Sequence, residues 1–362
     1  MHALFIIGTR PEAIKLSEPI KRFAKDSLAT ILLTGQHPAL ARDTLFQLNV
    51  EHGSIREPIL ATSNWQMTLR DEIDGIRTNI CWPHETAPEL PSVAVVQGDT
   101  DSAMLGAIHA KRLGMKVVHV EAGLRTYADE PFPEESNRRV IGQIADVNCC
   151  PSWQAAENLR QERAPGRILV TGQTGLDAIV RSETKMPWEM FDVSGAWEVI
   201  VALHRQETRP HMEHIAHQLS ICAREMSKAA KFRVILHPNP AASDVFRERL
   251  PGFDNLTMHG PLTFEQMGYA LRTAHLAITD SGGIQEERAF YGAPSLILRK
   301  ITERPETHPW CKLADPANVG LRKFIGPYIM SPCPQPGCRA YGYGDGTASQ
   351  AVADAIREAG ER

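Results

Sequence analysis

The amino-acid sequence predicts an α/β protein made of two doubly wound domains, each built on a parallel sheet. Short apolar runs rich in Val, Ile and Leu alternate with helical patterns along most of the chain, as expected for strands buried on both faces. A polar stretch around Trp188 interrupts this alternation near the middle of the chain. The chain has 362 residues, of which 43% are hydrophobic, which is enough for two cores at roughly 150 residues per domain.

The expected strands fall into two sets. The first set comprises residues 3–7, 30–33, 93–96, 117–120 and 168–170. The second set comprises residues 199–203, 234–236, 256–258, 276–279 and 295–298. We therefore predict a first domain at residues 1–175 and a second domain at residues 176–346, with the boundary inside residues 172–193.

The last part of the chain does not continue the alternation of strands and helices. Residues 327–346 are rich in Pro and Gly and are predicted to form a long surface connection. Residues 348–359 carry an amphipathic helical pattern, so we expect a short final helix there.

Charge and composition exclude several classes of protein. A net charge of −4 without a long basic run argues against a nucleic-acid-binding protein. The first residues are apolar only over 3–7, so we expect neither a signal peptide nor a membrane span, and a cytoplasmic location. The seven cysteines are an odd count, which favours reduced thiols, and Cys149 and Cys150 are predicted to be core residues.

Two junctions that follow predicted strands have the pattern of anion sites. In residues 8–12, Pro11 stands where a helix would begin, so that free backbone N–H groups and Arg10 would point at one spot. After the strand at 276–279, Ser281 can cap a helix, and the Gly pair behind it lets the backbone approach a ligand closely. A polyphosphate fits both junctions.

Polar residues collect at the predicted carboxyl ends of the strands, which is where open parallel sheets bind ligands. The residues concerned are Arg10, Asp99 and Glu121 in the first domain, and His204, His237, Asp280 and Ser281 in the second. We therefore predict a site in a cleft between the two domains.

A series of short motifs, in this order along the chain, resembles the UDP-N-acetylglucosamine 2-epimerases of the bacterial, non-hydrolysing type. The motifs lie at residues 8–15, 34–37, 97–100, 119–125, 133–138, 204–205, 237–240, 280–287 and 302–306. The resemblance implies a GT-B-like fold with two Rossmann-type domains around a cleft, and a C-terminal helix at 347–362 that packs back on the first domain.

The reaction implied by the resemblance is the interconversion of UDP-GlcNAc and UDP-ManNAc. No Gly-x-Gly-x-x-Gly fingerprint opens the chain, so a nicotinamide cofactor has no obvious place, and we expect neither a cofactor nor a metal. The family's route is elimination of UDP to a 2-acetamidoglucal, followed by re-addition. This route requires acid–base groups for both faces of the sugar and cationic stabilisation of the departing diphosphate.

The resemblance also assigns roles to individual residues. The catalytic residues would be Asp99, Glu121, Glu134 and His204. The substrate-binding residues would be Arg10, Lys15, Arg138, His237, Phe264, Ser281, Gly282, Gly283 and Glu287, with Phe264 near uracil and Glu287 on the ribose. Gln36 and His37 would lie near an allosteric site. A homodimer and a role in cell-surface polysaccharide biosynthesis are further expectations from the family.

Residues at five places allow more than one interpretation. Either Glu134 or its neighbour Glu135 is expected to pair structurally with an arginine, and Lys15 could be an ordinary surface lysine. The sequence Asp-Thr-Asp at 99–101 is similar to a metal-binding motif, but Asp101 suits a helix N-terminus. The histidines at 211, 214 and 217, and Cys333 with Cys338, are interpreted as a helix face and a loop rather than metal sites.

Departures from the family pattern keep further functions open. Residues 38–40 differ from the family's usual Arg-Glu-Met, which weakens the case for allosteric activation. Residues 288–291 are expected to add bulk near the nucleotide, so the sugar could be a modified N-acetylhexosamine. The sequence is also compatible with a hydrolysing 2-epimerase that releases ManNAc and UDP, with a GT-B glycosyltransferase, and with a non-catalytic nucleotide-sugar-binding protein.

Overall fold

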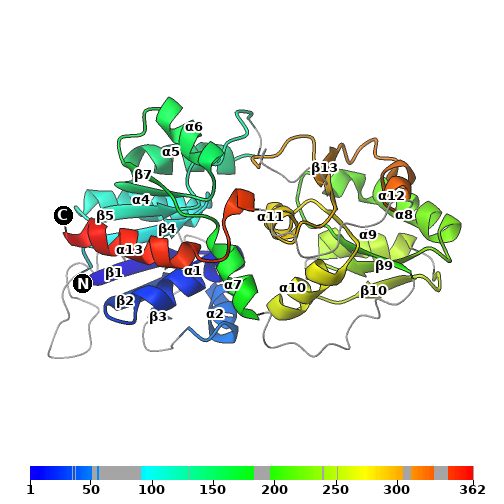
Figure 1. Cartoon of the computed structure of the whole chain (residues 1–362), viewed down its shortest axis with the longest axis horizontal. Helices are drawn as coiled ribbons and strands as arrows, with labels where there is room; N and C mark the ends of the chain where they lie inside the picture. Colours follow the sequence, from blue (N-terminus) through cyan, green and yellow to red (C-terminus); the bar gives the residue numbers. More distant parts are fainter. Residues whose placement is uncertain are drawn as a thin grey trace. The chain divides into compact units, whose positions relative to one another are not determined.

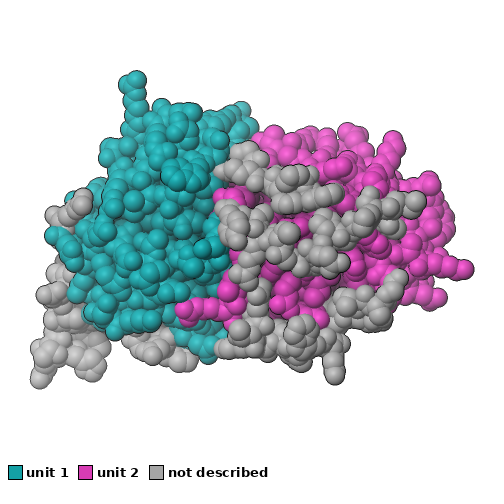
Figure 2. Space-filling model, viewed as in Figure 1, with its two compact units in different colours: residues 1–178, 344–362 teal, residues 179–343 magenta. Residues whose placement is uncertain are grey.

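The computed structural model describes residues 1–34, 36, 38–50, 55–56, 91–129, 131–182, 196–238, 240–250, 252–304, 311–329 and 341–361. The chain divides into two compact units, coloured separately in Figure 2. Unit 1 comprises Met1–Ala178 with Gly344–Arg362, and unit 2 comprises Ile179–Tyr343. Each unit is an α/β structure on a parallel sheet, which confirms the predicted fold class. The predicted cleft between the units stays a prediction.

The sheet of unit 1 has the strand order β3-β2-β1-β4-β5-β6-β7. Its strands are β1 (His2–Ile7), β2 (Leu28–Leu33), β3 (Ile55–Arg56), β4 (Val93–Gln97), β5 (Lys116–Val120), β6 (Val147–Cys150) and β7 (Arg167–Val170). All residues of β1 are buried, as expected for a central strand covered on both faces. The order reverses between β1 and β4, and the carboxyl ends of such neighbouring strands are the usual place for a ligand.

Helices cover the sheet of unit 1 and complete its core. They are α1 (Arg10–Phe23), α2 (Pro38–Gln47), α4 (Asp101–Arg112), α5 (Glu134–Ile144), α6 (Trp153–Gln161), α7 (Thr174–Ser182), which continues into unit 2, and α13 (Ala348–Glu361). Figure 1 shows α13 beside α1, and Val352 and Ile356 of α13 enter the same core cluster as β1. Asp177 of α7 accepts the N–H groups of Ala348 (3.1 Å) and Ser349 (2.7 Å), and so caps the first turn of α13.

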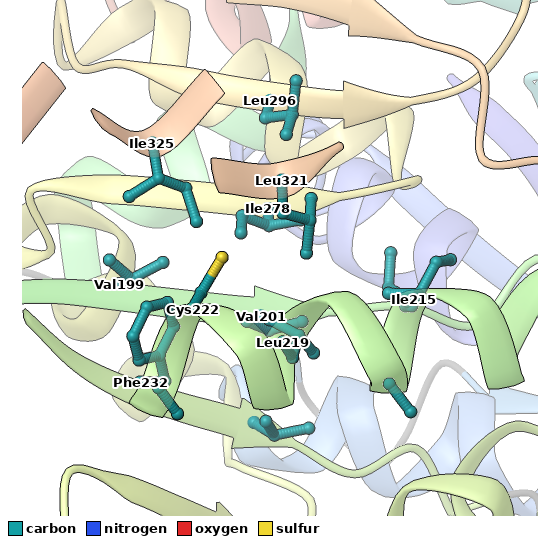
Figure 3. Packing of buried hydrophobic residues seen from close by; sticks show 14 of the residues in the cluster. Val199, Val201, Ile215, Leu219, Cys222, Phe232, Ile278, Leu296, Leu321 and Ile325 are labelled. Carbon is teal, nitrogen blue, oxygen red and sulfur yellow. The ribbon is translucent and has the colours of Figure 1, made fainter. Parts of the chain in front are cut away.

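Unit 2 contains a sheet with the order β10-β9-β8-β11-β12-β13. Its strands are β8 (Trp197–Ala202), β9 (Ala230–Ile235), β10 (Leu256–His259), β11 (Leu276–Thr279), β12 (Ser295–Leu298) and β13 (Cys311–Ala314). Its helices are η3 (Arg209–His211), α8 (Met212–Glu225), α9 (Pro240–Arg249), α10 (Phe264–Thr273), α11 (Gly282–Phe290), α12 (Leu321–Ile329) and η4 (Tyr341–Tyr343). Figure 3 shows Ile215, Leu219 and Cys222 of α8 packed over β8, with α12 contributing Leu321 and Ile325.

The sequence prediction missed three strands, β3, β6 and β13. The sequence of β6, Val-Asn-Cys-Cys, is short and is interrupted by an asparagine. Asn148 is fully buried, and its side-chain amide donates to the Gly142 carbonyl at 3.2 Å. The prediction that Cys149 and Cys150 are core thiols is confirmed, since both are buried and free. Burial raises the pKa of Cys150 to about 12, so this thiol stays protonated.

Two expectations about the second half are wrong. The predicted surface connection from 327 begins too early, because α12 continues through Pro327 to 329 and buries Tyr328 in the core of unit 2. Arg288 does not add bulk beside a ligand, because its side chain is fully buried and donates to the carbonyls of Ala274 (3.0 Å) and Pro294 (2.8 Å). This guanidinium therefore ties together the ends of elements inside unit 2.

Among the described residues, no helix is both long and apolar enough to cross a membrane.

Candidate functional site

The junction of β1 and α1 differs from its predicted form. Pro11 lies in the first turn of α1, as expected, and Arg10 is the first helical residue and is half-buried. However, the N–H groups of Gly8 and Thr9 both donate to Glu12 Oε2, each at 2.6 Å. These two N–H groups are therefore not available to an external anion, because a carboxylate of the same helix occupies them, and the role of Arg10 at this junction stays a prediction.

Glu12 is the most buried carboxyl group near this junction. It is only 1% exposed, and its other oxygen accepts the hydroxyl of Thr100, the N-cap of α4. Burial raises the pKa of Glu12 to about 7, although the hydrogen bonds from Thr100, Gly8 and Thr9 act in the opposite direction. Glu12 therefore joins the loop after β1 to the loop after β4 and titrates near neutrality.

Asp99 follows β4 through Gly98, whose φ of 72° lies in the left-handed region. Its carboxylate forms an ion pair with Arg138 of α5, a residue that is 3% exposed. The amide of Asn137 donates both to the Asp99 carbonyl and to Asp101 Oδ1, each at 2.9 Å. The N-terminal part of α5 thus holds the backbone and the side chain of Asp99 at the end of the sheet.

Glu121 follows β5, the neighbour of β4, and has a φ of 64°, which is unusual for a residue with a side chain. Its side chain is 7% exposed and forms an ion pair with Lys15 of α1. Its Oε2 also accepts the amides of Gln97 (2.8 Å) and Gln173 (3.0 Å). A strained backbone costs about 1–3 kcal/mol and is typical of functional sites. Lys15 is consequently not an ordinary surface lysine.

The two neighbouring glutamates at the start of α5 have different surroundings. Glu135 is buried, accepts the Thr126 N–H at 3.0 Å and lies 3.0 Å from Arg139. The oxygen that accepts the Thr126 N–H, Oε2, also lies 3.6 Å from Arg138 Nη1. Glu135 therefore has structural arginine partners, as was predicted for one of the two glutamates. Glu134, the first residue of α5, is half-buried.

In unit 2, His204 and Asp280 lie at the ends of the adjacent strands β8 and β11. The buried Asp280 carboxylate accepts the His204 N–H at 3.1 Å and the Arg205 N–H at 3.0 Å. The His204 ring stacks on His237, with ring centroids 5.5 Å apart and an angle of 17°. Partial burial lowers the pKa of His204, while the Asp280 charge opposes this shift. The structure thus brings together two of the predicted histidines.

The turn after β11 has the predicted form. The Ser281 hydroxyl accepts the Ile284 N–H at 3.5 Å and caps α11. A Cβ atom on Gly282 would lie only 2.5 Å from Arg304 Nη1. Arg304 forms an ion pair with Glu286 at 2.6 Å, so it cannot move aside without weakening that pair. Gly282 is therefore required by the close approach of the Arg304 side chain.

The other predicted site residues lie between β2 and α2, on α10 and on α11. Gln36 accepts the Ser102 hydroxyl at 2.7 Å, whereas His37 lies outside the described residues. Phe264 begins α10 and is 8% exposed, and Glu287 is half-buried on α11. Gly283 follows Gly282 in the first turn of α11.

The metal-binding interpretations gain no support within the described ranges. These ranges contain no group of three or more His, Cys, Asp or Glu residues arranged to hold a metal. Asp101 is the first residue of α4, as predicted, and His214 Nε2 lies 2.9 Å from the Val319 carbonyl. Cys333 and Cys338 lie outside the described residues.

Sequence reasoning missed several residues of this site. Glu12 was recognisable from Thr9-x-x-Glu12, which has the form of a capping box. Gln97 and Asn137 lie within motifs shared with the family, but the sequence assigned them no role. Gln173 carried no local signal, since its contact with Glu121 joins residues that are 52 positions apart.

Comparisons with known proteins show the family of this chain. The family model of UDP-N-acetylglucosamine 2-epimerase matches residues 21–357. The UDP-N-acetylglucosamine 2-epimerase of Bacillus subtilis is 31% identical, over 84% of this chain and 80% of the relative. The enzyme of Yersinia pestis is 30% identical, over 84% of both chains.

Solved structures are similar over almost the whole chain. A co-structure of S. aureus MnaA with UDP has a TM-score of 0.80 and 27% identity, and covers 99% of this chain and 96% of that one. The UDP-GlcNAc 2-epimerase of Methanocaldococcus jannaschii, in complex with UDP-GlcNAc and UDP, has a TM-score of 0.81 and 25% identity. That likeness covers 99% of this chain and 100% of the other.

Proposed function

This chain belongs to the UDP-N-acetylglucosamine 2-epimerase family, and we propose that it interconverts UDP-GlcNAc and UDP-ManNAc reversibly without releasing a free sugar. The family membership and the ligands named for its relatives support the substrate class. The arrangement of the carboxylates at the sheet edge of unit 1 supports the chemistry.

The proposed reaction proceeds by elimination and re-addition. A base removes the C2 proton of the sugar while the bond from C1 to the UDP oxygen breaks, which leaves a 2-acetamidoglucal with a double bond between C1 and C2. In the return step an acid delivers a proton to the other face of C2, and the UDP oxygen bonds again to C1. Two proton transfers on opposite faces require at least two positioned groups.

The observation that carries the proposal is the pair formed by Asp99 and Glu121. They follow the adjacent strands β4 and β5, and each is held by a cation of its own, Arg138 for Asp99 and Lys15 for Glu121. Both are therefore presented at one sheet edge in fixed positions, as general acid–base catalysis requires. Glu134 is the third proposed member of this set.

The two cations also have a proposed role toward the substrate. The family resemblance assigns Lys15 and Arg138 to UDP, and in the structure they are paired with Glu121 and Asp99. We propose that the diphosphate competes for these cations when substrate binds. A carboxylate that loses its cation is a stronger base, so substrate binding would itself activate the site.

Unit 2 is proposed to bind the nucleotide. The N-terminus of α11, with Ser281, Gly282 and Gly283, is suited to an anion because of its backbone donors and the helix dipole. Arg10 of unit 1 and His237 would contact the phosphates, Glu287 the ribose and Phe264 the uracil. His204 is proposed to assist the departure of UDP. Homodimeric assembly, a cytoplasmic location, an allosteric site at Gln36 and His37, and a role in polysaccharide biosynthesis remain proposals from the family resemblance.

The deciding experiment uses the purified protein with UDP-GlcNAc in deuterium oxide, without added metal or nicotinamide, followed by proton NMR. We expect UDP-ManNAc with deuterium at C2. Free ManNAc and UDP would instead identify a hydrolysing 2-epimerase. An unchanged spectrum would contradict the proposal and direct the search to modified N-acetylhexosamines or to an acceptor-dependent transferase.

A further inference from the structure

We propose that Glu12 is a positioning residue for Asp99, acting by clamping the loop after β4 to the loop after β1. This inference rests on the proposed function, because it gives Glu12 a part in the acid–base chemistry of Asp99. It concerns a residue that does not itself touch the reacting atoms.

The clamp uses both oxygens of the carboxylate. Oε2 accepts the N–H groups of Gly8 and Thr9, each at 2.6 Å, and also the Thr9 hydroxyl at 3.1 Å. The other oxygen accepts the hydroxyl of Thr100, which is the residue directly after Asp99. A single buried side chain thereby joins the loop that carries Arg10 to the loop that carries Asp99.

The two loops are in direct contact at this point. A Cβ atom on Gly8 would lie 2.1 Å from Ser102 Oγ and 2.9 Å from Thr34 Oγ1. Ser102 lies in the first turn of α4, two residues after Thr100. Because only a glycine fits between the loops, the clamp spans a closely packed contact, in which a small displacement of one loop is passed on to the other.

Asp99 has little freedom apart from this clamp. Asn137 holds its carbonyl at 2.9 Å, and Arg138 holds its carboxylate. The bond between Glu12 and Thr100 restrains the loop from its other side. Thr100 also accepts the Ala103 N–H at 3.1 Å, so that its hydroxyl hydrogen is directed toward Glu12 when Glu12 is ionised.

The ionised form of Glu12 is the one that makes all of these contacts. Below a pH of about 7 burial favours the protonated form, which has one oxygen fewer to accept hydrogen bonds. The charged residues next to the clamp along the chain are Asp99 and Asp101 on either side of Thr100 and Arg10 at the start of α1, while Lys15 and Arg138 are paired with Glu121 and Asp99. Protonation turns one oxygen of Glu12 from an acceptor into a donor and so changes the hydrogen bonds around Thr100. We therefore expect kcat to fall as the pH falls through about 7, although the clamp stays closed, because a carboxyl group whose pKa is raised by burial is stabilised in its buried position when it is protonated.

The test begins with Glu12→Gln, which keeps the shape of the side chain but cannot titrate. We expect kcat at pH 8 to fall about 10- to 100-fold, with KM changed less than about threefold, since misplacement of a catalytic group has this size of effect. The fall of kcat on the acid side of pH 7 should also disappear. Glu18→Gln is the matched control, because Glu18 is a buried glutamate farther along the same helix, paired with Lys21, and should leave kcat unchanged.

A second pair of variants tests the same contact independently, in case Glu12→Gln does not fold. Thr100→Val removes the hydroxyl that Glu12 holds and should reproduce the loss of kcat, whereas Thr100→Ser should retain the activity. Wild-type kcat in both Glu12→Gln and Thr100→Val would overturn the proposal.

A measurement without turnover separates this proposal from the proposed function. Carboxyl ¹³C NMR should show that the Asp99 signal shifts with a midpoint near pH 7 in the wild type, and that this transition is lost in Glu12→Gln. If the transition is present but no epimerisation occurs, the proposed function fails and the clamp stands. An Asp99 signal that is the same in wild type and Glu12→Gln across this pH range would overturn the clamp.

Discussion

Lys15 and Glu121 form an ion pair that joins the second turn of α1 to the end of β5, between residues separated by 106 positions in the sequence. The pair is largely buried, with 14% and 7% of the two side chains exposed. A buried carboxylate in this position depends on its cation, because removing one partner leaves an uncompensated charge away from water.

Lys15→Met should therefore destabilise the protein and abolish epimerisation. We expect the free energy of unfolding in urea to fall by about 3 kcal/mol, the order observed when one partner of a buried pair is removed. Lys21→Met is the matched control, since Lys21 pairs with Glu18 on the same helix but is more exposed, at 28%. An equal loss of unfolding free energy in both variants would show that the ion pair with Glu121 contributes no more to stability than the more exposed pair of Lys21.

Asp99→Asn should keep UDP binding and lose turnover. The amide can still lie beside Arg138, but it can neither take nor return a proton. Calorimetric titration with UDP and the deuterium-exchange assay check the two halves of this prediction. Near-normal exchange at C2 would remove Asp99 from the acid–base set.

Arg10→Ala should weaken UDP binding by about 1.5–3 kcal/mol, the usual contribution of a hydrogen bond to a charged group. The measurement is the dissociation constant for UDP at fixed ionic strength. Arg22→Ala provides the control on the last turn of the same helix, where Arg22 contacts Gln350 at the surface. If both variants bind UDP like the wild type, Arg10 is not a phosphate ligand.

Gly282→Ala should disturb the turn after β11, because the new methyl group would lie 2.5 Å from Arg304. Overpacking of this kind costs about 1–3 kcal/mol, measured here as a lower free energy of unfolding. Gly283→Ala should be tolerated better, since its nearest neighbour would be Ser281 Oγ at 3.8 Å. The opposite order of the two stabilities would contradict the close approach of Arg304.

The pH dependence of stability should carry a contribution from Glu12. Its pKa is raised from 4.5 to about 7 by burial, so the folded state binds a proton more tightly than the unfolded state does. The stabilising contribution of protonated Glu12 is complete below pH 4.5 and is lost as the pH rises to about 7, by about 3 kcal/mol. Comparing wild type with Glu12→Gln in urea at several pH values isolates this contribution. A constant difference between the two proteins would show that Glu12 does not titrate in this range.

Several parts of the fold could be predicted from the pattern of neighbouring residues in the sequence. The run at 3–7 is continuous and apolar, and it lies within β1, an interior strand of its sheet between β2 and β4. The cap at Ser281 and the start of α1 near Pro11 follow from the chemistry of a few adjacent residues. By contrast, β6 and β13 are four residues long, and neither carries enough apolar residues to stand out without the neighbouring strand.

The candidate site was predictable only in part. The motifs placed Asp99 and Glu121 at strand ends, and both lie there. They did not reveal that Glu12 would occupy the N–H groups expected to bind an external anion, although the capping-box spacing was visible. Nor did they reveal that Arg288 would be buried among backbone carbonyls, because a guanidinium in a sequence is normally expected at the surface.

By itself, the sequence determined the α/β class, most of the strands, the caps and the family, because these depend on periodicity and on contacts between residues close together in the chain. Only the tertiary structure decided which charges meet. Lys15 reaches Glu121, and Glu12 reaches Thr100, because the parallel order of β1, β4 and β5 brings their carboxyl ends to one edge. Such pairings depend on strand order and on burial, and these are properties of the whole sheet rather than of any short segment.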